Sequence, residues 1–222
     1  MPEGVAILDR LGVLDAVLAH GARRFRGLRF RSPEGVWAEA EFPGTAPHPE
    51  YGLVLPRREL DHVLFERARE TPGVEARDGF RVHSLRMQGD RIEGITGARV
   101  RGAGAPVRDP GAQESFAAAL TIGADGIHSL FHRACGLNRS LLRRRRFGIT
   151  GHFTGITDRA DHVEVLVQPR GELYVAPGPG DLTLVALLLE ARAMRDFRHD
   201  LPAPRRLLPR AGPEPLRDPL GR

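Results

Sequence analysis

Two stretches of the sequence place a charged side chain where a nucleotide could bind. In "LTIGADGIHSLFHRACGL" (Leu120–Leu137), an apolar run ends in Gly-Ala-Asp-Gly. A carboxylate held at the end of a strand, such as Asp125, can accept hydrogen bonds from ribose hydroxyls, and Gly126 lets the backbone approach a ligand closely. In "LPRRELDHVLFERA", Arg57 lies at a strand-to-helix turn, where its planar guanidinium offers paired donors to a pyrophosphate.

Each of these residues also has a plainer interpretation. Asp-Gly is a common turn dipeptide, and a single arginine is most often a surface residue. The segment after Asp125 is expected to start a helix at Ile127–Ser129, whose positive dipole end would favour a phosphate. Taken singly, a turn aspartate and a surface arginine are the better explanations. Taken together, in this order and spacing, the residues favour a nucleotide site.

Three potential metal ligands follow the same turn. His128, His132 and Cys135 are spaced i, i+4 and i+7, which on a helix is one face and could ligate zinc. No fourth ligand lies nearby in the sequence, so we predict no metal site. The sequence also lacks the pattern of a Ser/His/Asp or Cys/His nucleophile, so no catalytic residue is assigned.

The chain is basic, with a formal net charge of +5, and all 33 of its basic residues are arginine. The densest run, Arg143–Arg146, lacks the interleaved aromatic or glycine residues of single-strand binders. We therefore expect no nucleic-acid partner, and a solvated or phosphate-facing surface instead.

The composition is that of a globular protein of one or two domains: 222 residues, 41% hydrophobic and 27% charged. The first residues carry Asp9, Arg10 and Asp15 and lack a basic start, so no signal peptide is predicted. The longest apolar run, Leu182–Leu189, is far shorter than the roughly 20 residues of a membrane span. A single cysteine fits the reducing cytoplasm, which is the expected location.

Periodicity predicts the elements that would position these residues. Apolar residues at helical spacing run from Val5 to Leu18, with Gly12 as a break, and a hairpin is expected around Ser32–Gly35. A short strand and a helix follow, and Pro72-Gly73 ends that helix. A three-stranded meander then leads into the Asp-Gly turn. Its candidate strands are Phe80–Leu85, Arg91–Val100 and Ser115–Gly123. Alternating segments from Phe147 to Leu189 predict an antiparallel sheet.

The order of these motifs resembles the middle section of the FAD-dependent oxidoreductases that include aromatic-ring hydroxylases, geranylgeranyl-type reductases and flavin-dependent halogenases. Three stretches carry the resemblance: "AILDRLGVLDAVLAHGA", "LPRRELDHVLFERA" and "IGADGIHSLFHRACGL". The resemblance implies that Arg57 reaches the phosphates of FAD. It also implies that Asp125 and Gly126 form the family's Asp-Gly motif, and that Val82 matches a position whose backbone meets the adenine. For Val82, a plain core valine is an equally good interpretation.

The sequence departs from the family in two places. It contains neither the Gly-x-Gly-x-x-Gly turn that seats the ADP part of FAD nor the family's second Gly-Asp motif. We therefore expect an internal section of a longer flavoenzyme. The expected fold is mixed α/β: an incomplete, Rossmann-like FAD-binding domain with a β-meander at 1–140, with 22–52 inserted towards the substrate domain. An antiparallel substrate-domain sheet is expected at 141–200 and a proline-rich tail at 201–222.

The resemblance implies an FAD-dependent oxidoreductase, monooxygenase-like, that acts on an apolar or aromatic small molecule with NAD(P)H as electron donor. The flavin would carry the chemistry. The nearest enzymatic alternative is an FAD-dependent reductase of an isoprenoid chain. An alternative of another class is a non-catalytic, truncated remnant or subunit that docks against a separately encoded nucleotide-binding piece.

Overall fold

The computed structural model describes residues 1–100, 113–137, 146–156 and 161–194. The chain divides into two compact units. Unit 1 combines residues 1–64 with 144–222, and unit 2 is 65–143. The expected tail at 201–222 and the arginines at positions 143–145 lie outside the described residues. Within the described part of the chain, no helix has the length and hydropathy needed to cross a membrane.

The helices of unit 1 form its small apolar core. They are α1 (Pro2–Arg10), α2 (Leu14–Ala19) and the start of α3 (Arg57–Glu70), which continues into unit 2. The predicted break at Gly12 is confirmed, because this residue has φ +66° and separates α1 from α2. Val13 and Val17 pack with Val63 of α3 in the core.

A two-stranded antiparallel ribbon, β1 (Arg23–Phe25) and β4 (Gly52–Val54), is formed by residues between α2 and α3 in the sequence. The Phe25 side chain is buried and pairs edge-to-face with Phe42. Gly52 lies opposite Phe25 in the ribbon, and a Cβ at Gly52 would overlap the Phe25 ring. Only glycine fits opposite this ring without displacing it.

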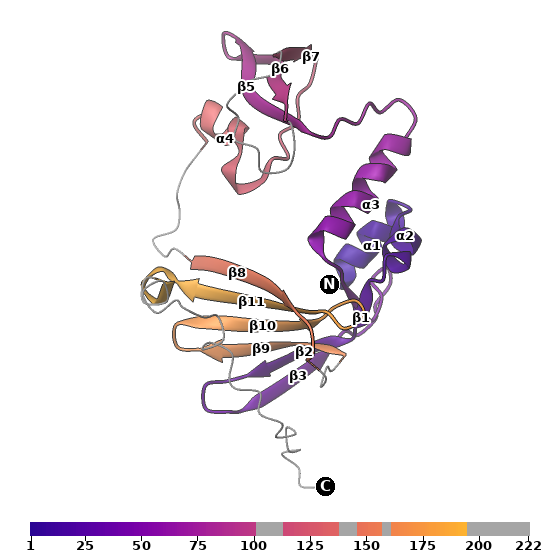
Figure 1. Cartoon of the computed structure of the whole chain (residues 1–222), viewed down its shortest axis with the longest axis vertical. Helices are drawn as coiled ribbons and strands as arrows, with labels where there is room; N and C mark the ends of the chain where they lie inside the picture. Colours follow the sequence, from indigo (N-terminus) through magenta and orange to yellow (C-terminus); the bar gives the residue numbers. More distant parts are fainter. Residues whose placement is uncertain (101–112, 138–145, 157–160, 195–222) are drawn as a thin grey trace. The chain divides into compact units, whose positions relative to one another are not determined.

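A six-stranded sheet makes up the rest of unit 1, in the order β3-β2-β9-β10-β11-β8 (Figure 1). Its strands are β2 (Gly27–Arg31), β3 (Trp37–Glu41), β8 (Arg146–Phe153), β9 (His162–Gln168), β10 (Gly171–Pro177) and β11 (Thr183–Glu190). The predicted hairpin is confirmed as β2–β3. The antiparallel sheet predicted from Phe147 to Leu189 is confirmed, because β9, β10, β11 and β8 pair antiparallel. The hairpin joins this sheet by a parallel pairing of β2 with β9, which was not predicted. Strands β2 and β9 come from distant parts of the chain, so the alternation of residues within each strand does not indicate whether the two run parallel or antiparallel.

Unit 2 contains the predicted meander, β5 (Phe80–Gln88), β6 (Arg91–Arg99) and β7 (Glu114–Ala117). The third strand ends at Ala117, so the expected strand to Gly123 is too long. Pairing stops where Ala117 faces Gly94, which has φ +153°. Beyond it, Leu120 and Ile122 are 76% and 80% exposed and pair with no described strand. A run of strand-forming residues becomes a strand only where a partner strand exists.

We expect Val17→Ala to lower the free energy of unfolding by about 2 kcal/mol, because Val17 is only 1% exposed and the truncation leaves a cavity beside Val13 and Val63. Urea unfolding followed by circular dichroism measures the change. The matched control is Val36→Ala, at a residue that is 66% exposed, for which we expect a change within about 0.5 kcal/mol. Equal effects at both positions would contradict the assignment of the core.

Candidate cofactor-binding site

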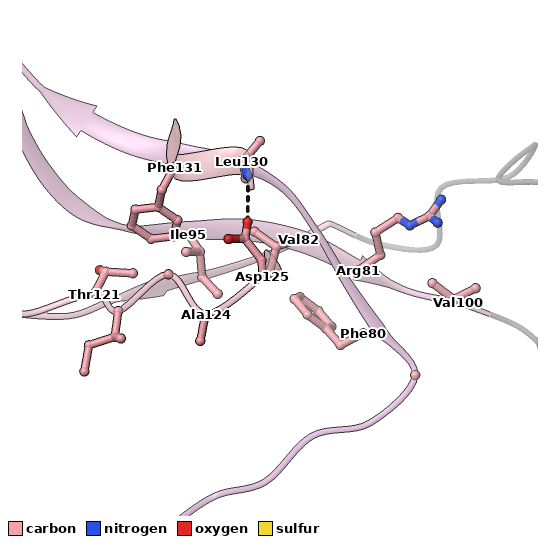
Figure 2. A pocket seen from close by; sticks show the side chains of 13 residues that line it. Phe80, Arg81, Val82, Ile95, Val100, Thr121, Ala124, Asp125, Leu130 and Phe131 are labelled. Carbon is pink, nitrogen blue, oxygen red and sulfur yellow. Dashed lines mark hydrogen bonds between the residues drawn. The ribbon is translucent and has the colours of Figure 1, made fainter. Parts of the chain in front are cut away.

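Unit 2 holds a pocket of about 690 Å³ between the start of the meander and the segment that follows it (Figure 2). Strands β5 and β6 form one wall, and residues 121–131 form the other. The lining residues are Gly79, Phe80, Arg81, Val82, Ile95, Val100, Thr121, Ile122, Gly123, Ala124, Asp125, Leu130 and Phe131. The pocket is therefore mostly apolar, with a few polar groups, as in most small-molecule sites.

Asp125 is the carboxylate of this pocket. Its Oδ2 accepts a hydrogen bond from the Leu130 backbone N–H at 2.6 Å (Figure 2). The Ser129 hydroxyl and this N–H hold the pKa of the Asp125 carboxyl below its usual value, because both donate to the charged form. The side chain is exposed and ionised at neutral pH, and a carboxylate offers more lone pairs than these two donors use.

The chain after Asp125 turns before it becomes helical. Gly126 has φ +76° and starts the 3-10 turn η1 (Gly126–His128), a backbone conformation that favours glycine. Ser129 then has φ −45° and ψ 128°, and its Oγ accepts from the His132 N–H at 3.2 Å as the N-cap of α4 (Leu130–Ala134). The α-helix therefore begins one to three residues after the predicted start at Ile127–Ser129. With only five residues, α4 also has little dipole to offer a phosphate.

Asp125 is also not at the end of a strand, because β7 ends at Ala117 and an irregular segment lies between them. What holds the Asp125 carboxylate is instead the turn itself, through Ser129 and Leu130. The contact of α4 with β5 then fixes this turn against the meander.

Val82 lies on the opposite wall of the pocket. It is 38% exposed, so the interpretation as a plain core valine is wrong. The β5–β6 register shifts between Val82 and Ser84, which is the signature of a β-bulge. Because β5 is an edge strand of its sheet, its outer backbone groups have no partner in the ladder. The structure thus brings Val82 and Asp125 to one pocket.

Two polar residues of the pocket were missed by the sequence analysis. The Thr121 hydroxyl oxygen is buried and makes no hydrogen bond within the described structure. Arg81 is exposed at the pocket, and its guanidinium points away from Asp125 (Figure 2). The signal for Thr121 was its position as a polar residue inside an apolar run. Arg81 gave no signal, because arginines occur throughout this chain.

The comparison with known families decides what kind of pocket this is. A family model described as "FAD binding domain" matches residues 2–192, which is most of the chain. The chain belongs to this FAD-binding family. The mixed α/β fold with several sheets agrees with that membership, and the FAD-binding resemblance read from the sequence is confirmed.

One curated protein and several solved structures are also similar to this chain. Phenazine 1,6-dicarboxylic acid hydroxylase PhzS of Lysobacter antibioticus is 34% identical over 134 residues, which cover 58% of this chain and 30% of that protein. PqsL of P. aeruginosa, solved in complex with 2-aminobenzoylacetate, has a TM-score of 0.66 at 18% identity, over 93% of this chain and 54% of PqsL. The flavin-dependent halogenase CmlS has a TM-score of 0.72 at 18% identity, over 90% of this chain and 35% of CmlS. This chain thus spans only part of the length of each of these proteins.

Arg57, the expected phosphate ligand of this FAD-binding chain, belongs to unit 1, whereas Asp125 and Val82 line the pocket in unit 2. It is the first residue of α3, its side chain is 82% exposed, and its Nε donates to Asp61 Oδ1 at 2.6 Å. This carboxylate raises the pKa of Arg57. The pair is a surface i, i+4 ion pair, and the role of Arg57 towards phosphates stays a prediction.

The alternative zinc ligands do not come together. Ser129 interrupts the helix between His128 and His132, so the i, i+4, i+7 face does not form. Among the described residues, His128, His132 and Cys135 are not part of any group whose ligand atoms could hold one ion. Of the arginine run, Arg146 is described: it starts β8, and its guanidinium pairs with Glu172 at 3.4 Å.

We expect Ser129→Ala to raise the pKa of the Asp125 carboxyl towards the ordinary aspartate value of about 3.9, because it removes the main donor to the charged form. A folded-state pKa below the unfolded one stabilises the turn above about pH 4, and this contribution is lost as pH falls through the folded value. An NMR titration of the Asp125 carboxyl carbon measures both midpoints. The control is Ser84→Ala on β5, for which no shift is expected. An unchanged midpoint in Ser129→Ala would contradict this account of the turn.

Proposed function

We propose that the pocket of unit 2 binds the adenosine part of FAD, and that the whole protein is an FAD-dependent monooxygenase acting on an aromatic or apolar small molecule. The observation that carries the proposal is the Asp125 carboxylate, which the turn holds in one pocket with the exposed edge of β5. Membership in the FAD-binding family names the ligand that this arrangement would take.

The residues of the pocket fit a nucleoside. The pocket volume of about 690 Å³ lies within the range of small-molecule sites. A buried hydroxyl without a hydrogen-bond partner, as at Thr121, is costly and is satisfied when a polar ligand group reaches it. Phe80, Ile95 and Phe131 supply the apolar surface on which a planar ring can lie. We assign Asp125 to the ribose hydroxyls, since a carboxylate accepts two hydrogen bonds from a diol.

The backbone on each side of the pocket supports this assignment. At Val82, the outer groups of an edge strand offer a donor and an acceptor to the edge of an adenine. Gly126 follows Asp125 but is not among the lining residues; a Cβ there would meet no atom within 4 Å, so a ligand could approach its backbone. Arg57 would serve the phosphates, where a guanidinium pairs well with two oxygens.

Bound FAD would supply electron transfer and oxygen activation, so the chain needs to bind and orient rather than to react. NAD(P)H is the proposed electron donor, as the resemblance to the hydroxylases implies. The comparisons favour an aromatic substrate: PhzS is named for a phenazine dicarboxylic acid, and PqsL was solved with a substituted aminobenzoyl compound. The six-stranded sheet supports an apolar ligand, because Leu166, Leu173 and Leu187 occupy one row across it.

We also propose that a nucleotide-binding piece covers the outer side of the segment around Asp125, at 120–127. Leu120, Ile122 and Ile127 are 76%, 80% and 90% exposed, and apolar side chains this exposed and this close in sequence are typical of a surface that packs against another part. The cytoplasm is the proposed location, which the single free cysteine, Cys135, fits.

Substitutions at Asp125 test the pocket. In the 222-residue chain, we expect Asp125→Ala to weaken FAD binding roughly ten- to a hundredfold, because a charged hydrogen-bond acceptor is lost. Asp125→Asn should weaken binding less, since an amide oxygen can still accept from the Leu130 N–H and keep the turn. Quenching of flavin fluorescence gives the affinities, and circular dichroism shows whether the fold is kept.

The matched control is Asp90→Ala, which removes an exposed carboxylate in the β5–β6 turn, away from the pocket lining. Affinity in this variant should equal that of the parent. If Asp125→Ala binds FAD as the parent does, Asp125 has only a role in the turn and the proposed site is wrong.

Activity is tested separately. With FAD and NADPH or NADH supplied, we expect aromatic carboxylic acids to stimulate NAD(P)H oxidation and to gain one oxygen atom, detected by mass spectrometry. An isoprenoid substrate that is reduced instead would favour the reductase. FAD binding without any turnover would favour a non-catalytic subunit.

A further inference from the structure

Three side chains with metal-ligating atoms lie together on the six-stranded sheet of unit 1. Glu39 and Glu41 are two residues apart on β3, so both point to the same face. Gly27 of β2 pairs with Glu41 on one side and with His162 of β9 on the other. Because residues paired across a sheet share a face, the two glutamates and the histidine face one another across a position without a side chain.

His162 is the buried member of this group, with 3% of its surface exposed. Its Nε2 lies 3.2 Å from Glu39 Oε1 and 3.9 Å from Glu41 Oε1. Despite these distances, neither ring nitrogen forms a hydrogen bond of acceptable geometry in the described structure. Buried polar atoms are nearly always satisfied, so a buried imidazole that lies beside two carboxylates without a hydrogen bond to either indicates that a further group belongs between them.

The other ring nitrogen of His162, Nδ1, has a carboxylate beside it, as the histidines of metal sites commonly have. Asp161 Oδ1 lies 3.0 Å from His162 Nδ1. In protein metal sites, the histidine ring nitrogen that does not bind the metal is usually oriented by a carboxylate or a carbonyl. A proton on Nδ1, on the side of Asp161, leaves the lone pair on Nε2, the nitrogen nearest to Glu39 and Glu41.

Three carboxylates surround the His162 ring: Glu39, Glu41 and Asp161. Arg29 pairs with Glu39, and Arg26 pairs with Asp161 and Glu41. The pairing with Arg29 also keeps the pKa of Glu39 below its usual value, so this carboxyl is in the ionised form that binds metals.

The arginines leave the inward-facing atoms largely accessible. Arg29 Nε donates a hydrogen bond to Glu39 Oε2 at 2.8 Å, whereas the other carboxylate oxygen of Glu39, Oε1, is the one near His162. Arg26 reaches Glu41 Oε1 only at 3.5 Å and is held instead by Asp161 at 2.6 Å. Binding of a cation at Glu41 would therefore displace one weak contact.

We infer that Glu39, Glu41 and His162 form a site for a divalent transition-metal ion, most favourably Zn²⁺, with a water as the fourth ligand. In a tetrahedral zinc site with bonds of about 2.0–2.1 Å, neighbouring ligand atoms lie about 3.4 Å apart. The three ligand atoms here all lie within 4.8 Å of one another, and two of the separations are 3.2 and 3.9 Å. Such an ion would join the edge strand β3 to β9 across β2.

Zinc binding to the metal-free 222-residue chain tests this inference, by competition against a chromophoric chelator. We expect one equivalent to bind with a dissociation constant in the micromolar range or below, and a rise in melting temperature. Co²⁺ in place of Zn²⁺ should give the visible absorption of a tetrahedral site. Glu39→Gln and Glu41→Gln should each weaken binding at least tenfold, and Asp161→Asn about ten- to a hundredfold, since it orients the histidine.

Two controls separate this site from other zinc ligands. Glu34→Gln changes an exposed carboxylate in the turn of the same β2–β3 hairpin, and it should bind zinc as the parent does. The double variant His132→Gln/Cys135→Ser removes the second group of potential ligands and should also bind as the parent does.

Three outcomes would overturn the inference. One is the absence of saturable binding below about 100 µM Zn²⁺, a concentration at which binding is worth only about 5 kcal/mol. Another is unchanged affinity in Glu39→Gln and Glu41→Gln. The third is a lower melting temperature in Glu39→Gln with no zinc binding by the parent, which would identify the cluster as a histidine–carboxylate ion pair. None of these readouts depends on FAD or on activity.

Discussion

The parallel pairing of β2 with β9 is the constraint on which unit 1 depends. It joins the N-terminal hairpin to the strands after Arg146, so one sheet is built from two distant parts of the chain (Figure 1). Parallel neighbours cannot be connected by a tight turn, and the intervening residues must leave the sheet and return. In this chain, α3 and unit 2 lie within that excursion. The same pairing sets Gly27 between Glu41 and His162, so the proposed metal site is a direct consequence of the strand order.

The pocket of unit 2 depends on one short turn, the turn that follows Asp125. A left-handed glycine, a carboxylate bonded to the Leu130 amide, and a serine cap turn the chain back onto β5. Asp125 holds this turn, and in the proposed site its remaining lone pairs would accept hydrogen bonds from a ribose. A carboxylate that the turn already holds would lose little freedom when such a ligand binds.

The pocket of unit 2 and the Glu39–Glu41–His162 group differ in how deeply their polar groups are buried. The pocket consists of residues from β5 to α4, and its charged residues, Arg81 and Asp125, are exposed. The Glu39–Glu41–His162 group spans three strands, and its central imidazole is 3% exposed. A buried, unsatisfied nitrogen destabilises the fold unless something binds it, whereas an exposed carboxylate is satisfied by water. For this reason the histidine, rather than the glutamates, is the evidence for a ligand at that site.

The sequence by itself determined the features that depend on neighbouring residues. The break at Gly12, the β2–β3 hairpin, the end of α3 before Pro72 and the Asp-Gly turn all follow from glycine, proline and local periodicity, and the motif order gave the FAD-binding family. Only the tertiary structure decided where β7 ends, because a strand requires a partner, and that Ser129 separates His128 from His132. It also decided that His162 meets Glu39 and Glu41. His162 is far from both glutamates in the sequence, and no local pattern encodes which strands will pair.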